Sequence, residues 1–406
     1  MRRLTVSLGG ALSVSMLALW ACVGQDLPPG PSSSSGLPDA SSSEDASADS
    51  GTTSACAAPF ADCDGDGTCE TSLEVDPANC GVCGHDCGAG AACAQKSCQP
   101  VTLMSNLSKA ASAAVNATAL VVLAEGGPKV CPKSGCAGSS PAALASGEVF
   151  PAAPHTISLD ANNAYWLGRS GGAGGQYELR LCAIAGCGLA PATIDDAQLG
   201  SEMRREQEQV LRYDPSGDVT RIYVDGSKPK EYLTNASIPN SLYFALWYGK
   251  MAFSNTDSAT GGTRGVYVSD FANAVPTRIM NEGQLVAMID GVVYASRAVD
   301  GTFDAIFSCP ITGCGGVGTN LGGTGSASAT GKIADMIADA SGLYWVESLG
   351  SAGRVMHCSL PDCKGGPRAL ASSQNNPVMV TTDESFVYWV NAGTGASDGA
   401  VVRVAK

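Results

Sequence analysis

Three aspartates at alternate positions are the residues whose spacing points most directly to chemistry. Asp62, Asp64 and Asp66 precede Gly67 in the pattern D-x-D-x-D-G, which is the first half of a calcium-binding loop. Carboxylates at alternate positions can converge on a hard cation, and the glycine permits the sharp turn between them. The sequence therefore predicts a calcium site at this loop, and the alternative is a solvated acidic turn.

The residues after this pattern decide which kind of calcium loop is expected. The Thr68 carbonyl and the Glu70 carboxylate would supply further oxygen ligands, directly or through water. A helix–loop–helix site is closed by a glutamate at its twelfth position, but that position is Leu73, and Glu74 comes one residue later. We therefore expect a shorter loop, which resembles the loops of thrombospondin type 3 repeats.

Eight cysteines crowd around this loop, within residues 56–98. The segment has few large apolar side chains, so covalent cross-links must replace a hydrophobic core. Four disulfides are expected, although the sequence does not reveal their pairing. Cys80-Gly-Val-Cys83 alone would also suit zinc or a redox dithiol, but zinc requires thiolates in better-defined ligand pairs. The eight are Cys56, Cys63, Cys69, Cys80, Cys83, Cys87, Cys93 and Cys98.

Four later cysteine pairs share the spacing C-x4-C, with a glycine or a proline between the two cysteines. Cysteines this close suit a disulfide across a hairpin between the outer strands of a β-sheet, which would contribute about 2–3 kcal/mol at most. Metal binding would require two pairs to converge, which repeated units around a ring prevent. The pairs are Cys131 and Cys136, Cys182 and Cys187, Cys309 and Cys314, and Cys358 and Cys363.

The start of the chain predicts export and a lipid anchor. Two arginines precede an apolar stretch, Leu4–Trp20, which is typical of a signal peptide. The stretch runs into Leu19-Trp-Ala-Cys22, which resembles a bacterial lipobox. Residues 1–21 are then removed, and Cys22 becomes an acylated N-terminus held at a membrane. Ordinary signal cleavage is the alternative. Of the 17 cysteines, 16 remain besides Cys22, an even number that suits disulfides in an oxidising compartment.

An acidic linker follows the expected anchor. Residues 22–55 are rich in serine and proline and have almost no large apolar side chain, which predicts a flexible spacer. Residues 23–95 contain 12 of the acidic residues and no lysine or arginine, in a chain with a net charge of −14. Such an acidic arm repels phosphate backbones, so nucleic acid is not an expected partner.

A short phrase returns three times in the rest of the chain. The segments 157–168, 336–347 and 380–391 each contain an apolar run, an aspartate in a turn and a strand that carries Tyr-Trp. Tyr344 and Tyr388 are 44 residues apart, a period that suits a four-stranded propeller blade. The remaining blades are more degenerate, and we take Val121, Tyr165, Tyr223, Phe253, Tyr294, Tyr344 and Tyr388 as equivalent positions.

The predicted fold class is therefore all-β, a seven-bladed β-propeller over residues 101–406 preceded by the small disulfide-rich module, 56–98. Six and eight blades are the alternatives. Neighbouring strand residues face opposite sides, so each Tyr-Trp pair should pack into both adjoining inter-blade cores rather than line a ligand site. The repeated aspartates, Asp160, Asp339 and Asp383, are expected to form turns. Residues 201–211 break the pattern and predict a polar insertion with a short helix.

Two resemblances bear on function. The cysteine-rich segment that begins at Asp62 resembles a module common in secreted and lipid-anchored proteins of myxobacteria, which implies location more than activity. The repeated Asp…Tyr-Trp phrase resembles propellers of the NHL family, the YWTD family of low-density-lipoprotein receptors and related bacterial families. The resemblance implies binding of proteins, peptides or glycans, since only a minority of such propellers are hydrolases or lyases.

The expected function is that of a membrane-anchored, extracytoplasmic binding or scaffold protein, which uses a propeller surface to recognise a protein or a glycan. The expected location is the bacterial cell envelope, with a lipid anchor in the outer membrane or at the cell surface. Calcium is the one cofactor that the sequence suggests. The alternative is an extracytoplasmic hydrolase or lyase with its site in the central channel, which would need converging polar groups with shifted pKa values there.

Overall fold

Apolar strands separated by turns rich in glycine and aspartate fold into a succession of antiparallel sheets. The computed structural model describes residues 56–136, 138–151, 153–170, 177–195, 202–206, 209–213, 219–224, 231–232, 241–255, 263–270, 276–299, 303–323 and 332–406. Contacts divide the chain into two units, and all of these residues belong to the second, Ser54–Lys406. The predicted signal peptide, Cys22 and the acidic linker lie outside the described residues.

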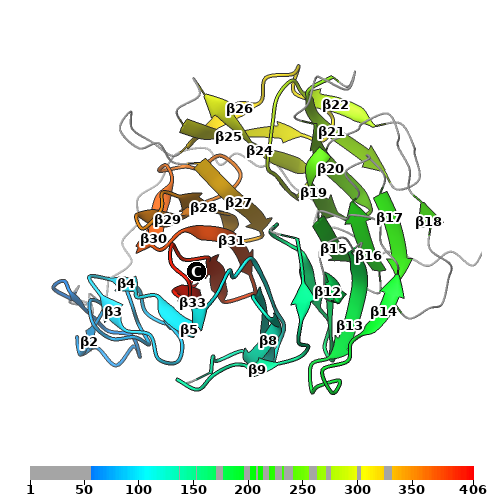
Figure 1. Cartoon of the computed structure of the whole chain (residues 1–406). Coiled ribbons are helices and arrows are strands. Elements are labelled where there is room, and N and C mark those ends of the chain that lie inside the picture. Colours follow the sequence, from blue (N-terminus) through cyan, green and yellow to red (C-terminus); the bar gives the residue numbers. More distant parts are fainter. Residues whose placement is uncertain are drawn as a thin grey trace, which may run out of the picture. The chain divides into compact units, whose positions relative to one another are not determined.

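Seven sheets follow one another around a central axis, which confirms the all-β, seven-bladed β-propeller (Figure 1). Consecutive strands pair antiparallel within each blade, and the first strand of the main meander lies innermost. Blade 1 contains β6 (Ser112–Val115), β7 (Ala119–Ala124), β8 (Gly127–Pro132) and β9 (Ala142–Ala143). Blade 2 contains β10 (Glu148–Val149), β11 (Ile157–Leu159), β12 (Asn163–Ser170), β13 (Glu178–Ala183) and β14 (Ala192–Asp195).

The middle blades continue this order. Blade 3 contains β15 (Glu202–Glu206), β16 (Gln209–Tyr213), β17 (Val219–Tyr223) and β18 (Glu231–Tyr232). Blade 4 contains β19 (Ser241–Trp247), β20 (Lys250–Asn255), β21 (Gly265–Asp270) and β22 (Thr277–Met280). Blade 5 contains β23 (Val286–Ile289), β24 (Val292–Val299), β25 (Phe303–Pro310) and β26 (Thr319–Gly323).

The last blades bring the two ends of the propeller together. Blade 6 contains β27 (Lys332–Asp339), β28 (Gly342–Ser348), β29 (Gly353–Cys358) and β30 (Arg368–Gln374). Blade 7 contains β31 (Pro377–Thr382), β32 (Phe386–Asn391), β33 (Gly399–Ala405) and, from the start of the propeller, β5 (Val101–Leu107). β5 pairs antiparallel with β33, so that Met104 lies opposite Val401. The ring is therefore closed by backbone hydrogen bonds between its first and last strands.

The sequence prediction for residues 201–211 was wrong. The described residues of this segment form the hairpin of β15 and β16, rather than a polar insertion with a short helix. Its charged residues hid a strand pattern in which Met203 and Val210 are buried against blade 2. The register of this blade was also misjudged, because Tyr223 ends the third strand, whereas Leu211 belongs to the second.

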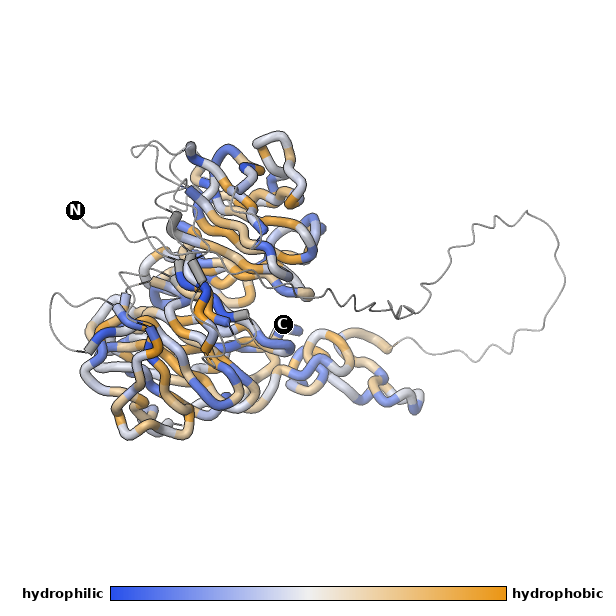
Figure 2. The backbone as a smooth tube through the Cα atoms, turned by 90° about the vertical axis from the view of Figure 1, so that its right-hand side faces the viewer, coloured by the Kyte–Doolittle hydropathy of each residue, from blue (hydrophilic) through white to orange (hydrophobic). Residues whose placement is uncertain are grey.

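The Tyr-Trp pairs pack between blades, as predicted. Trp166 contacts the buried cluster that contains Val121 of blade 1, whereas Tyr165 packs with Met203 of blade 3. Trp345 and Tyr344, and Trp389 and Tyr388, divide in the same way between the preceding and the following blade. Apolar residues accordingly run along the strands (Figure 2). Each such pair joins three consecutive blades.

The antiparallel order gives the propeller two distinct ends. Turns between first and second strands and between third and fourth strands lie at one end, which contains Asp160, Asp339 and Asp383; we call it the Asp-turn end. Turns between second and third strands and the connections between blades lie at the opposite end. His155 precedes β11 in one of these connections, and we call this the His155 end.

The repeated aspartates form turns, as predicted, and also bind the tyrosines. Asp383 accepts hydrogen bonds from the backbone amides of Ser385 and Phe386, each at 2.9 Å, and from the Tyr388 hydroxyl at 2.7 Å. Lys133 of blade 1 lies 2.8 Å from the same carboxylate. Burial by itself would raise the pKa of Asp383, but these hydrogen bonds outweigh it and hold the pKa below its ordinary value.

The disulfide-rich module packs on blade 7 at the Asp-turn end. It contains β1 (Phe60–Ala61), β2 (Thr71–Ser72), β3 (Cys93–Ala94) and β4 (Ser97–Cys98). Arg403 of β33 stacks on Phe386, 4.4 Å from guanidinium carbon to ring centroid, and donates to the Ala89 carbonyl at 2.9 Å. Gly88 has a φ of 81°, and an added Cβ would lie 2.6 Å from the Phe386 ring. The backbone of the module therefore lies directly against the closing blade.

Replacing Asp383 with asparagine should change how stability depends on pH. A carboxylate with a lowered pKa stabilises the fold above the unfolded-state pKa of about 4, and this contribution is lost as pH falls through the folded-state pKa. We expect Asp383→Asn to lower the free energy of unfolding by about 1–3 kcal/mol at pH 7, and the difference from wild type to shrink near pH 3. Urea unfolding at both pH values measures this.

Asp290→Asn is the matched control for this substitution. Asp290 occupies the corresponding turn between β23 and β24, and it makes no hydrogen bond or ion pair within the described part of the chain. Its variant should therefore follow the wild-type pH dependence. An Asp383→Asn variant that loses as much stability at pH 3 as at pH 7 would contradict the assignment of the effect to the ionised carboxylate.

Candidate functional site

A channel runs through the centre of the propeller and holds a cavity of about 320 Å³. All seven innermost strands contribute to its wall, which consists mostly of alanine, valine, leucine, isoleucine and methionine side chains. The polar or charged residues of the wall are His155, Ser158, Arg204, Arg205 and Thr381. This apolar pocket with a few convergent polar groups is the natural candidate for a binding or catalytic site.

One hydrogen bond between side chains reaches across this channel. His155, in the connection that enters blade 2, places its Nε2 2.8 Å from Oδ1 of Asp335, which lies on β27 of blade 6. The other Asp335 oxygen accepts a hydrogen bond from the Val380 amide of blade 7 at 2.8 Å. His155 is 8% exposed and Asp335 2% exposed, so water has little access to the pair. The two side chains therefore join non-adjacent blades.

The surroundings keep this histidine neutral. Burial lowers the pKa of His155, the Arg204 guanidinium lowers it further, and Asp335 opposes both with a weaker effect. The His155 carbonyl also accepts a hydrogen bond from the Met203 amide at 3.0 Å, which fixes the backbone beside the ring. A neutral imidazole therefore donates its Nε2 hydrogen to the Asp335 carboxylate.

A histidine held by a carboxylate is a known arrangement for general base catalysis. Here, however, both oxygens of Asp335 have partners within the fold, and no hydroxyl or thiol of the described residues forms a hydrogen bond with the His155 ring. The pair is suited to holding blades 2, 6 and 7 together. Nothing in the sequence links His155 to Asp335, which lies 180 positions further along the chain.

The aspartates of the predicted calcium loop converge in the structure. One carboxylate oxygen from each of Asp62, Asp64, Asp66 and Glu70 lies within 4.8 Å of the others. Asp62 accepts hydrogen bonds from two backbone amides of the loop, at 2.7 and 2.9 Å, which fixes its tight turn. Hard oxygen donors in this number and arrangement fit calcium better than a soft metal.

Thr68 contributes its side chain to this loop. Its hydroxyl joins two of the carboxylates, at 2.6 Å from Asp66 and 2.8 Å from Glu70. The expected role of its carbonyl as a metal ligand stays a prediction. The side-chain and backbone hydrogen bonds of Thr68 lower the pKa of Asp66. The group is exposed to solvent, so a cation could enter it directly.

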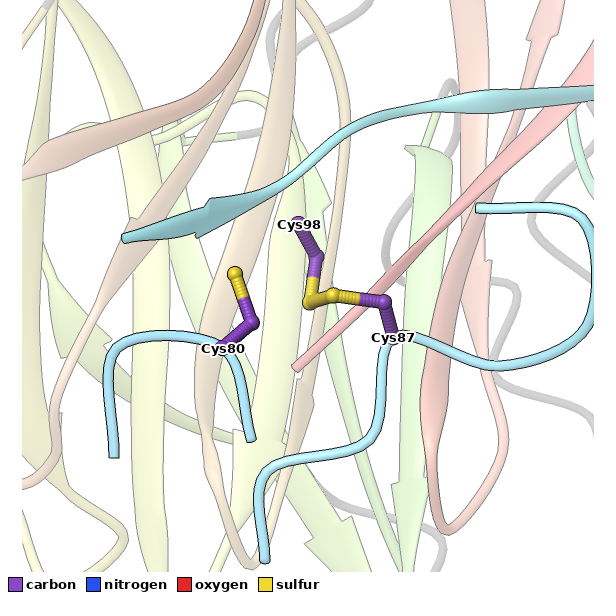
Figure 3. A group of neighbouring side chains, drawn as sticks. All are labelled: Cys80, Cys87 and Cys98. Atoms are coloured by element: carbon purple, nitrogen blue, oxygen red, sulfur yellow. A yellow bond between two sulfur atoms is a disulfide. The ribbon is translucent and has the colours of Figure 1, made fainter. Parts of the chain in front are cut away.

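All cysteines of the module lie in disulfides. The pairs are Cys56–Cys69, Cys63–Cys83, Cys80–Cys93 and Cys87–Cys98. The sulfur atoms of Cys80, Cys87 and Cys98 lie within 4.8 Å of one another, with the Cys87–Cys98 bond beside Cys80 (Figure 3). Because these sulfurs are bonded in pairs rather than present as thiolates, they cannot hold zinc in this state.

The four C-x4-C pairs are also disulfides. In each pair the first cysteine lies on the third strand of its blade, and the second lies in the turn that follows. These bonds are Cys131–Cys136, Cys182–Cys187, Cys309–Cys314 and Cys358–Cys363. They belong to blades 1, 2, 5 and 6 and lie at the Asp-turn end. Their regular position indicates that each bond stabilises its own turn and that the four do not form a shared reactive site.

Comparisons with known proteins support the fold alone. Among the described residues, no helix is long and apolar enough to span a membrane. No protein-family model matches the chain, and no curated protein matches it.

Solved propeller structures do match. A structure of YCF48 bound to D1 peptide is 11% identical, covers 76% of this chain and 95% of that chain, and has a TM-score of 0.52. YCF48 from Cyanidioschyzon merolae is 9% identical, with coverages of 75% and 98% and a TM-score of 0.51. A chain in a mitotic checkpoint complex is 10% identical, with coverages of 75% and 92% and a TM-score of 0.51. The chain is thus similar in fold to these proteins, two of which were solved in complexes.

Proposed function

We propose that this protein is a membrane-anchored, extracytoplasmic binding or scaffold protein that recognises a protein ligand with a surface of its propeller. The main support for the proposal comes from the channel. There His155 and Asp335 are buried, and both oxygens of Asp335 already have hydrogen-bond partners within the fold. A rigid seven-bladed ring of this kind offers broad surfaces at its two ends. The similar propeller YCF48 was solved with a bound peptide, which favours a protein ligand over a glycan.

The His155 end is the better candidate for the recognition surface. The Asp-turn end carries the four disulfide-fastened turns and the module, whose contacts with Phe386, Arg403 and Lys406 occupy part of blade 7. The His155 end contains the connections between blades. Binding residues are commonly placed on loops that a rigid scaffold positions.

The proposed location is the bacterial cell envelope, with the anchor at Cys22 and the segment 22–55 as spacer. The disulfides support an oxidising compartment, since such bonds persist outside the cytosol. The chain also resembles myxobacterial lipoproteins in its cysteine-rich module. An anchored propeller with a free end would hold its ligand near a membrane, within the reach of the flexible spacer.

The second candidate function is an extracytoplasmic hydrolase or lyase. The specific observation in its favour is that the channel does contain a histidine, a carboxylate and an arginine close together, as His155, Asp335 and Arg204. A reaction would require the pair to open so that the imidazole could reach a substrate. An activity that is lost in His155→Gln, while the ligand still binds, would favour this candidate.

Photo-cross-linking tests the binding proposal. A benzoylphenylalanine placed at Glu125 or Ser351, both exposed at the His155 end, should form a discrete adduct with one envelope protein. The same probe at Leu189 or Tyr248, which are 48% and 85% exposed at the Asp-turn end, should form none. Adducts are measured by mass spectrometry. Equal labelling from both ends, or none from either, would contradict the proposed recognition surface.

Replacing Cys22 with serine tests the anchor. Serine cannot accept the thioether-linked lipid, so Cys22→Ser should move the protein from the membrane fraction to the soluble fraction. Cell fractionation followed by immunoblotting measures the change, with Cys136→Ser as a control that removes a cysteine elsewhere. Unchanged membrane association of Cys22→Ser would rule out lipidation at this residue.

The calcium proposal predicts weak binding at the module. We expect a dissociation constant on the order of 10⁻⁴–10⁻³ M, as in extracellular modules, because the ligand set lacks the closing glutamate. Calorimetry on the full chain should detect this binding and its loss in Asp64→Ala. Glu74→Gln, which removes a charge just outside the cluster, should leave it unchanged. If the wild-type chain shows no binding heat and no shift in melting temperature at millimolar calcium, the loop is a solvated acidic turn and not a calcium site.

A further inference from the structure

A second pocket, of about 200 Å³, lies between blades 4 and 5 at the His155 end. Asn255 ends β20 on one side, Arg264 stands just before β21, and Glu282 and Gln284 come from the connection between the two blades. Arg297 of β24 completes the wall. Hydrogen-bond donors from two blades therefore converge on one small volume.

Arg297 is held in a fixed orientation within this pocket. Its guanidinium carbon lies 4.0 Å from the centroid of the Phe307 ring, and its Nε lies 3.7 Å from a Glu282 carboxylate oxygen. Stacking uses the face of a guanidinium, whereas its N–H donors point outward in the plane. The aromatic ring and Glu282 thus hold the guanidinium at the wall of the pocket.

Arg264 supplies a second positive charge. It is exposed, and it forms no ion pair within the described part of the chain. Among the described residues that line the pocket, Arg264 and Arg297 carry two positive charges and Glu282 carries one negative charge, an excess of one positive charge in a chain whose net charge is −14. Gln284 adds a neutral amide, which can donate hydrogen bonds to the same ligand.

We propose that this pocket binds a carboxylate group of a protein ligand, an inference that rests on the proposed binding function. A guanidinium group recognises a planar carboxylate through two parallel hydrogen bonds, and a second guanidinium beside it adds favourable charge. A single carboxylate balances the excess charge, whereas Glu282 would repel the larger negative charge of a phosphate group. The carboxylate can be an acidic side chain or the C-terminus of a peptide, and both sources present the same chemistry.

Three short peptides separate these sources. Acetyl-Ala-Ala-Glu-Ala-Ala-amide carries only a side-chain carboxylate, acetyl-pentaalanine carries only a terminal one, and acetyl-pentaalanine amide carries neither. Saturation-transfer NMR with the full chain in detergent measures weak binding of each. At least one of the two carboxylate peptides should bind saturably at millimolar concentration, and the neutral amide should not. Equal signals from all three peptides would overturn the proposal.

Substitutions locate the binding within the pocket. Arg264→Gln and Arg297→Gln should each weaken binding of the carboxylate peptide at least tenfold. Lys109→Gln removes one positive charge at the same end of the propeller but outside this pocket, so binding should stay within twofold of wild type. Glu282→Gln removes the repulsive charge and should tighten binding several-fold, a gain that an unfolded variant could not produce.

The outcome separates this inference from the proposed function on which it rests. If neither arginine variant differs from Lys109→Gln and Glu282→Gln binds like wild type, the pocket is only a surface ion pair and the inference fails. The proposed function would still stand if the cross-linked adduct at the His155 end formed in those variants. Loss of the adduct in every variant and in wild type would instead reject the binding function itself.

Discussion

The pairing of β5 with β33 is the interaction on which the rest of this structure depends. A ring of blades has no end that can be left unpaired, because an open first or last blade would expose both a strand edge and an inter-blade core. The backbone hydrogen bonds between these two strands join residues about 300 positions apart in sequence and complete blade 7. The disulfide-rich module precedes β5 directly and packs on the same blade through Gly88 and Arg403. Blade 7 is the blade formed from both ends of the propeller, and the module adds contacts to this same blade.

Once the ring is closed, packing between blades decides which residues remain available for function. The paired tyrosines and tryptophans are buried in the inter-blade cores, and the aspartates of the repeat form hydrogen bonds within turns. Each buried indole also needs a polar partner, and Trp345 donates to Glu347 at 3.0 Å while Trp389 donates to Gln374 at 2.9 Å. The most conspicuous side chains of the sequence are thus structural. Function is left to less conspicuous residues at the two ends of the ring.

The polar groups at the centre and at the rim differ in what they can offer a ligand. His155 and Asp335 meet across the channel, but burial and the Val380 amide commit them to holding distant blades. Arg264 and Arg297, between blades 4 and 5, line a pocket at the His155 end. The acidic loop at Asp62 is separate from both and belongs to the module. The proposed binding function therefore places ligand contacts at the periphery of the ring, whereas the polar pair in the channel holds blades together.

The sequence by itself determined the features that depend on local spacing. A period near 44 residues predicted the blades, and alternation placed Tyr and Trp on opposite faces of each strand, in the two adjoining inter-blade cores. Close cysteine spacing predicted four disulfides. Each of these features depends on spacing along the chain. The same logic failed at residues 201–211, where charged residues masked a strand. Only the tertiary structure decided the pairing of Cys63 with Cys83, the meeting of His155 with Asp335 and the pocket that joins Arg264 to Arg297. These contacts depend on how loops and whole blades are placed around the ring, and no periodic pattern along the chain encodes that placement.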